Sequence, residues 1–143
     1  MNTSTNLNNR STSSSNAPLI MLAENNEANI STISNYLQIK GYDVVVVRNG
    51  VEVIEQAQQT GPDIILMDIQ MPGMDGLSAM RHLRTLNNFS DVPIIAITAL
   101  AMPGDREKCL DAGANDYLSK PASLRKIVQL IEKYLGNDPV KTE

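Results

Sequence analysis

The sequence is poor in the residues that most often build metal clusters, disulfides and membrane spans. Its 143 residues include one cysteine, Cys109, and one histidine, His82. A single cysteine excludes an internal disulfide framework and a multi-cysteine zinc or iron–sulfur site. A single histidine likewise excludes a zinc site built on paired histidines. No apolar run approaches the ~18 residues that a membrane-spanning helix needs, so we expect no membrane segment.

Positive charge is also scarce. Twelve Lys and Arg residues stand against sixteen Asp and Glu residues, which gives a net charge of −4. Nucleic-acid-binding domains normally carry a basic stripe, so this balance argues against a nucleic-acid partner. The N-terminus lacks the apolar core of a signal peptide, because it is polar from Asn2 to Asn16. We therefore expect an acidic cytoplasmic domain that binds neither nucleic acid nor membrane.

The chain divides into three parts. Between Asn2 and Ala17, 13 of 16 residues are Ser, Thr or Asn, and such a segment cannot bury enough apolar area to offset its backbone entropy. We expect residues 1–17 to be a disordered tail or linker. Residues 18–136 form one domain of ordinary size. Residues 137–143 follow Gly136 and are expected to form a flexible C-terminal tail.

Short apolar runs within residues 18–136 predict buried strands. Continuous apolar runs, rather than alternating ones, are typical of parallel strands that are covered on both faces. Pro, Gly or Asp bounds most of these runs, as expected at strand ends. The runs are Leu19–Ala23, Val44–Val47, Ile64–Met67, Ile94–Ile97 and the weaker Tyr117–Leu118.

Amphipathic helical patterns separate the strands and follow the last one. The second pattern predicts a buried face through Val51, Ile54 and Ala57, and Asp75 is placed to cap the third helix. Five strand–helix units in series imply a parallel sheet with helices on both faces, joined by right-handed crossovers. The fold class is therefore α/β, a three-layer α/β/α sandwich. Ligands of such sheets bind beyond the carboxyl ends of the strands.

Polar residues stand at those strand ends. They comprise two acids, an amide, a hydroxyl and a cation, namely Glu24, Asp68, Asn25, Thr98 and Lys120. A carboxylate beside a cation is a candidate nucleophile, and a hard ion such as Mg²⁺ takes oxygen ligands and neutralises an incoming phosphoryl group. A lysine and a hydroxyl can hold the remaining phosphoryl oxygens. The set could support an aspartyl-phosphate intermediate.

Three motifs resemble the receiver domain of two-component response regulators. The run IILMDIQMPGMDG spans Ile64–Gly76, Thr98-Ala99 follows an apolar strand, and Lys120-Pro121 follows Tyr117. The resemblance covers residues 18–136 and is greatest to receivers of hybrid sensor histidine kinases. It implies a CheY-like, flavodoxin-like (βα)5 fold with strand order 2-1-3-4-5.

The resemblance also implies roles. Asp68 would be the phosphoacceptor, taking a phosphoryl group from a histidine kinase or histidine phosphotransfer protein. Thr98, with Ala99 beside it, and Lys120 would bind the phosphoryl group. Tyr117 would be the aromatic residue that switches a protein-interaction face when Thr98 moves.

A Mg²⁺ site and three structural residues complete the expected set. The metal ligands would be Glu24, Asn25, Asp68 and the backbone carbonyl of Gln70. The structural positions are Pro72, Gly76 and Pro121, and the Lys120–Pro121 bond is one that chemistry permits to be cis. Receivers also suggest a homodimer through the fourth helix, the fifth strand and the fifth helix.

Asn25 departs from the family pattern, which has a second acid at this position. An amide can still offer a carbonyl oxygen to Mg²⁺ but removes one negative charge. Unit charges ~4 Å apart interact by ~1 kcal/mol in water and ~4 kcal/mol at an effective dielectric of 20. We expect Mg²⁺ binding to weaken by an order of magnitude or more. The alternative is a pseudo-receiver, a protein-binding module that works without phosphorylation.

Enzymes on the same fold are the rival class. A haloacid-dehalogenase-type phosphatase would place a second Asp two residues after its nucleophile, where this chain has Gln70. A flavodoxin would need a phosphate loop after the first strand, where the residues from Glu24 to Glu27 would repel phosphate. We therefore expect a non-enzymatic receiver without a DNA-binding module, either standing alone or belonging to a larger hybrid kinase.

Overall fold

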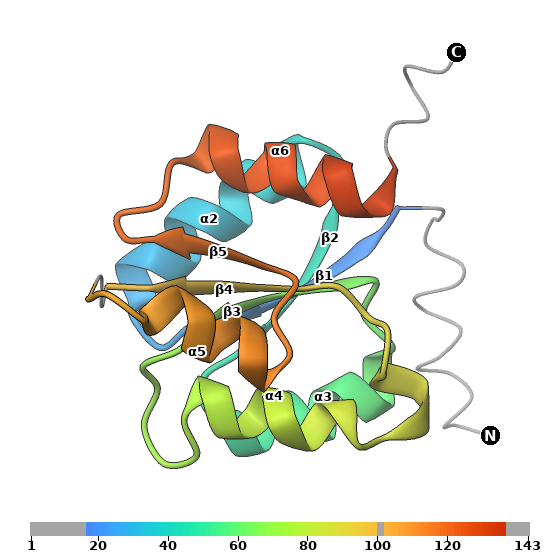
Figure 1. Ribbon diagram of the computed structural model, residues 1–143. Helices are drawn as coiled ribbons and strands as arrows, with labels where there is room; N and C mark the ends of the chain where they lie inside the picture. Colours follow the sequence, from blue (N-terminus) through green and yellow to red (C-terminus); the bar gives the residue numbers. More distant parts are fainter. Residues whose placement is uncertain (1–16, 100–101, 137–143) are drawn as a thin grey trace, which may run out of the picture.

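The computed structural model describes residues 17–99 and 102–136, and within them five parallel strands form one sheet (Figure 1). The strand order is β2-β1-β3-β4-β5, which confirms the order that the resemblance implied. The strands are β1 (Leu19–Ala23), β2 (Asp43–Val47), β3 (Ile64–Asp68), β4 (Ile94–Thr98) and β5 (Asp116–Ser119).

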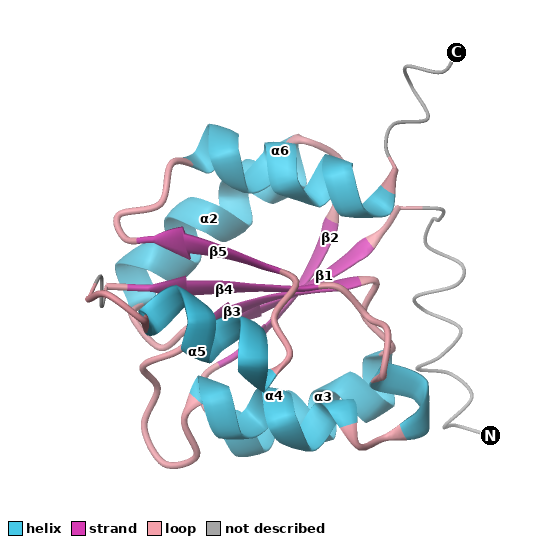
Figure 2. Cartoon of the chain, in the orientation of Figure 1, coloured by secondary structure: helices cyan, strands magenta, loops and turns pink. Residues whose placement is uncertain are grey.

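Helices cover both faces of the sheet. Figure 2 shows α2 and α6 on one side and α3, α4 and α5 on the other, which confirms the three-layer sandwich. A short 3-10 turn, Asn87–Phe89, precedes β4. The helices are α2 (Glu27–Ile39), α3 (Gly50–Thr60), α4 (Gly76–Arg84), α5 (Asp105–Ala112) and α6 (Leu124–Leu135). None of these helices, within the described part of the chain, is long and apolar enough to cross a membrane.

The strands are apolar in their interiors because each packs into two cores. In β1, Ile20 and Leu22 join the core under α2 and α6, while Met21 and Ala23 join the core under α3, α4 and α5. All five residues of β3 are buried. Because successive side chains point to opposite faces, a strand between two helical layers needs an unbroken apolar run.

Side chains cap most of the helices at their N-termini. The Asp75 carboxylate accepts a hydrogen bond from the Ser78 backbone N–H at 2.9 Å, which confirms the predicted cap of α4. Asn49 caps α3 in the same way through the Glu52 backbone N–H. These bonds satisfy N–H groups that the first helical turn leaves without partners.

The predicted buried face of α3 is wrong at Val51. Its side chain is 50% exposed, whereas Val53 is completely buried. The helix begins at Gly50, so the buried positions are Gly50, Val53 and Ala57, which follow helical spacing. The sequence pattern missed this because glycine carries no apolar side chain. Of the expected tails, only Ala17 lies within the described residues.

Candidate functional site

The sheet brings several of the predicted site residues to one edge. Asp68 and Thr98 are the last residues of β3 and β4, and Glu24 directly follows β1. Lys120 directly follows β5, and its backbone N–H donates to the Thr98 carbonyl at 2.8 Å. Since β1, β3, β4 and β5 are neighbours in that order, these residues share the carboxyl edge of the sheet.

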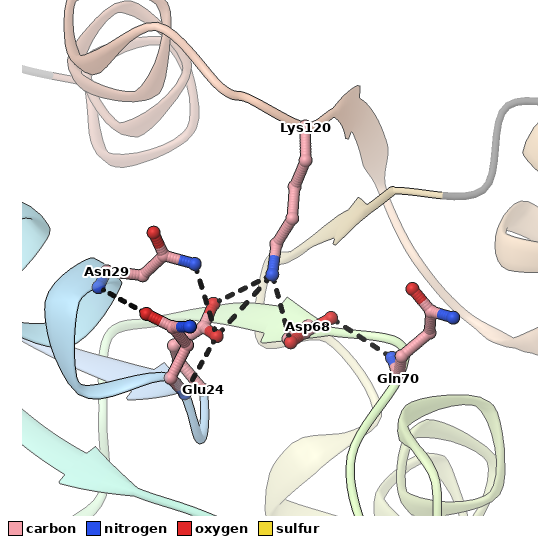
Figure 3. Close-up of polar contacts among 6 residues, drawn as sticks. Glu24, Asn29, Asp68, Gln70 and Lys120 are labelled. Carbon is pink, nitrogen blue, oxygen red and sulfur yellow. Dashed lines mark hydrogen bonds and ion pairs between the residues drawn. The ribbon is translucent and has the colours of Figure 1, made fainter.

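Lys120 joins two of the acids directly. Its Nζ lies 3.1 Å from Asp68 Oδ2 and 3.1 Å from Glu24 Oε1 (Figure 3). Both carboxylates are buried, each 3% exposed. The ammonium group therefore bridges residues that lie 52 and 96 positions away in the sequence.

Backbone and side-chain donors fix the two carboxylates further. The Gln70 backbone N–H donates to Asp68 Oδ1 at 3.0 Å. Glu24 Oε2 accepts from the Asn26 backbone N–H at 3.1 Å and from Asn29 Nδ2 at 3.5 Å. Each acid is thus held from more than one side, with its orientation set before any ligand binds.

Several opposing contributions set the pKa of the Asp68 carboxyl group. Burial raises the pKa of Asp68, the Gln70 N–H opposes this, the Glu24 charge raises it again, and Lys120 lowers it. The net direction is upward. Burial by itself would lower the pKa of Lys120, but its hydrogen bonds and charge interactions with Asp68 and Glu24 raise it. A neighbouring cation thus offsets only part of the cost of burying the phosphoacceptor candidate.

The other predicted residues lie around this centre. Thr98 is 1% exposed, and Tyr117 is half-buried against the core under α3, α4 and α5. Burial raises the pKa of the Tyr117 phenol. Ala99 and Pro121 line, with Glu24 and Lys120, a cleft of about 500 Å³ between α2 and the start of α6. The Lys120–Pro121 peptide bond is cis.

The loop after β3 is closed at its base by Gly76. The Gly76 backbone N–H donates to the Ile69 carbonyl at 3.0 Å. A side chain at position 76 would have no room, because a Cβ would lie 2.7 Å from the Asp68 carbonyl oxygen and 2.8 Å from Ile69 Cα. Pro72 lies exposed near the tip of the same loop.

The donor set suits a hard cation. Glu24 and Asp68 supply two carboxylates that meet at Lys120, and Asn25 lies exposed in the loop beside Glu24. Among residues 17–99 and 102–136, no three His, Cys, Asp or Glu side chains converge in a metal-binding cluster. Two carboxylates with amide and carbonyl oxygens fit Mg²⁺, which prefers oxygen ligands and retains water.

Sequence reasoning missed Asn29. This residue lies in the first turn of α2 and reaches back to Glu24. It could not be found from the strand-end rule, because it lies five positions along the chain and inside a helix. Only the direction in which α2 leaves β1 brings it to the site.

Comparison with protein families agrees with the receiver resemblance seen in the sequence, over nearly the whole domain. The model of the response regulator receiver domain matches residues 20–132. The chain belongs to this family. It is therefore a receiver domain of two-component signalling rather than a classical enzyme, and its family implies a histidine kinase or a phosphotransfer protein as partner.

Individual relatives support this membership. The chain is 37% identical over 118 residues to the polar-differentiation response regulator DivK of Brucella anthropi, covering 82% of this chain and 96% of DivK. It is also similar to a receiver domain of a sensor histidine kinase from Pseudomonas aeruginosa PAO1, with 40% identity, a TM-score of 0.79, and coverage of 85% and 100% of the two chains. That receiver holds a magnesium ion in its active-site cleft.

A second kinase receiver, from Syntrophus aciditrophicus, has 30% identity and a TM-score of 0.78, with coverage of 84% of this chain and 91% of that one. The likeness to receivers of histidine kinases agrees with the resemblance seen in the sequence. Receiver domains bind Mg²⁺, and the oxygen donors around Asp68 are suited to it.

The raised pKa of Asp68 predicts a stability change on substitution. Folding favours the protonated form, so this group's favourable contribution is full below the ordinary Asp pKa of about 3.9 and is lost as the pH rises through the folded pKa. In metal-free buffer at neutral pH, the Asp68→Asn variant should therefore unfold at a higher denaturant concentration than the native chain. The difference should shrink towards zero in acid.

Denaturant unfolding across pH, with Asp111→Asn as a control, measures this. Asp111 is exposed on α5, so its substitution should change the unfolding free energy by less than about 0.5 kcal/mol. A native chain that is more stable than Asp68→Asn at neutral pH would contradict the claim that folding raises the pKa of Asp68.

Proposed function

We propose that this receiver accepts a phosphoryl group from a phosphohistidine onto Asp68. The observation that carries the proposal is the contact of one lysine ammonium with two buried carboxylates at the carboxyl edge of the sheet. A carboxylate oxygen of Asp68 attacks phosphorus as the P–N bond of the phosphohistidine breaks. The imidazole nitrogen leaves with the bonding electron pair, and an acyl phosphate forms on Asp68.

Lys120 has two tasks in this scheme. Before phosphorylation it offsets the charges of Glu24 and Asp68, and afterwards it pairs with the phosphoryl oxygens. The buried Thr98 hydroxyl binds another phosphoryl oxygen, with Ala99 following it at the cleft. Because Lys120 N–H and the Thr98 carbonyl are hydrogen-bonded at 2.8 Å, the two phosphoryl-binding residues are mechanically linked.

Glu24, Asn25, Asp68 and the Gln70 carbonyl would hold Mg²⁺. The ion supplies positive charge that offsets repulsion between the acids and the phosphoryl group. The Gln70 N–H, at 3.0 Å from Asp68 Oδ1, keeps the phosphoacceptor oriented. Pro72, Gly76 and Pro121 shape the loops that carry these donors.

The switch runs through Thr98 and Tyr117. When Thr98 moves towards the phosphoryl group, Tyr117 turns inward and changes the face formed by α5, β5 and α6. This is a shift between two packings, driven by the preference of the phosphoryl group for one of them. The same face is the proposed homodimer surface. We place this exchange in the cytoplasm.

Asn25 favours a second candidate function. Glu24 and Asp68 are the two acids that contact Lys120, so the site should hold Mg²⁺ more weakly than one with a third acid at position 25. A receiver of this kind could act as a phosphorylation-independent binding module. The two functions differ in whether Asp68 becomes phosphorylated, and that difference can be measured.

Incubation with a small phosphodonor tests the phosphoacceptor directly. At millimolar Mg²⁺, intact-mass measurement should show the gain of one phosphoryl group, which chelation of the metal abolishes. Asp68→Asn should lose the gain entirely, and the exposed control Asp111→Asn should retain it. A gain that persists in Asp68→Asn would reject Asp68, and no gain in the native chain would favour the binding-module function.

Restoring the missing acid tests the metal site. Asn25→Asp should tighten Mg²⁺ binding about tenfold, because one added charge a few ångströms from the ion contributes more than ~1 kcal/mol. Titration of backbone amide shifts with Mg²⁺ measures the change. Asn88→Asp adds the same charge at the exposed turn before β4 and should leave the affinity nearly unchanged. Equal affinities of Asn25→Asp and the native chain would place the metal elsewhere.

A further inference from the structure

The Ile69 N–H, which donates to the Ile97 carbonyl at 3.1 Å, ties the loop between Asp68 and α4 to β4. Three further hydrogen bonds hold this loop. At its start, the Gln70 N–H donates to Asp68 Oδ1 at 3.0 Å. At its base, the Gly76 N–H donates to the Ile69 carbonyl at 3.0 Å. The third point comes from another element, because the N–H of Gly50, the first residue of α3, donates to the Met74 carbonyl at 3.1 Å. The N-terminus of α3 therefore supports the loop from outside.

Position 50 has no space for a side chain. A Cβ there would meet the Met74 carbonyl oxygen and would lie 2.7 Å from Met74 Cβ and 2.8 Å from Met74 Cγ. The first of these atoms is backbone, so a change of Met74 rotamer cannot relieve the contact. Any side chain at position 50 must displace the loop itself or the start of α3.

That displacement bears on the phosphoacceptor. The bond between Gly76 and Ile69 closes the loop at its base, so a shift at Met74 must be taken up within the loop. Met71 is buried at 7% exposure and restrains one part of it. The loop also contains Gln70, whose N–H orients the Asp68 carboxylate and whose carbonyl is a proposed metal ligand. The outer support and the metal site therefore share one short segment.

We propose that Gly50 is a positioning residue for the Mg²⁺ and phosphoacceptor site. Because Gly50 has no side chain, α3 can approach the loop and hold the Met74 carbonyl. This contact keeps the Gln70 carbonyl and the Asp68 carboxylate in the relative positions that the metal site needs. The role rests on the proposed function of Asp68. Gly50 itself touches neither carboxylate and acts through the loop.

Mg²⁺ affinity in the absence of any phosphodonor is the discriminating readout. Titration followed by the backbone amide shifts of the full chain should show about tenfold weaker binding in Gly50→Ala, as is typical when support around metal ligands is disturbed. Val53→Ala is the matched control, because Val53 is completely buried in the same helix. It should lower the stability of the fold yet change Mg²⁺ affinity less than about twofold, since it leaves the hydrogen bond from the Gly50 N–H to the Met74 carbonyl in place.

A second pair of variants removes support without adding atoms. Asn49 caps α3 by accepting from the Glu52 N–H at 2.9 Å, so Asn49→Ala should loosen the turn that holds Gly50. We expect about threefold weaker Mg²⁺ binding in Asn49→Ala and recovery in Asn49→Ser, because serine is also a good capping residue. This pair tests the positioning role of Gly50 even if the Gly50→Ala variant does not fold.

The outcomes separate the two proposals. A folded Gly50→Ala that binds Mg²⁺ within about twofold of the native chain overturns the positioning role, and so does equal weakening by Val53→Ala. Failure of the native chain to phosphorylate on Asp68 instead overturns the proposed function. Weak binding in Gly50→Ala and Asn49→Ala, with recovery in Asn49→Ser, supports the positioning role.

Discussion

The contact on which the site depends is a single ammonium group shared by two buried carboxylates. Burial of one unpaired carboxylate is costly, and burial of two close together is more so. Lys120 Nζ, 3.1 Å from both Asp68 and Glu24, offsets this cost without removing it, as the raised pKa of Asp68 shows. The site is therefore folded in a state that further positive charge would stabilise. Such a site is prepared for a divalent ion and for an anionic group that arrives with it.

The parallel sheet explains why these groups meet. Strands buried on both faces tolerate polar side chains only at their ends, and parallel strands bring their carboxyl ends to one edge. Asp68 and Thr98 end neighbouring strands, and Lys120 follows the next one. The loop from Ile69 to Asp75 then leaves the same edge and is supported by α3 through Gly50. The apolar interior thus provides the rigid frame, and the loops supply the ligands.

Sequence patterns located the strands, the Asp75 cap and the polar edge of the sheet. They could do so because the spacing of apolar residues and helix capping depend on residues that are close together in the sequence. The approach of Lys120 to Asp68 also followed from topology, although 52 positions separate them. Other features depend on packing that no local pattern encodes. Val51 was placed on the wrong face because the buried stripe runs through a glycine. Arg84 was missed although its guanidinium bonds the carbonyls of Phe89, Val92 and Gly113 and the Asn115 side chain. The upward pKa shift of Asp68 required knowledge of its burial.

The most direct test of the account is a crystal structure of the chain with Mg²⁺ and beryllofluoride, a mimic of the phosphoryl group. The account predicts beryllium bonded to a carboxylate oxygen of Asp68, with Lys120 Nζ and the Thr98 hydroxyl in contact with the fluorine atoms. It also predicts the metal between Asp68, Glu24 and the Gln70 carbonyl. An adduct on another residue, or Lys120 still bridging Glu24 and Asp68 at saturating beryllofluoride with nothing bound between them, would contradict it.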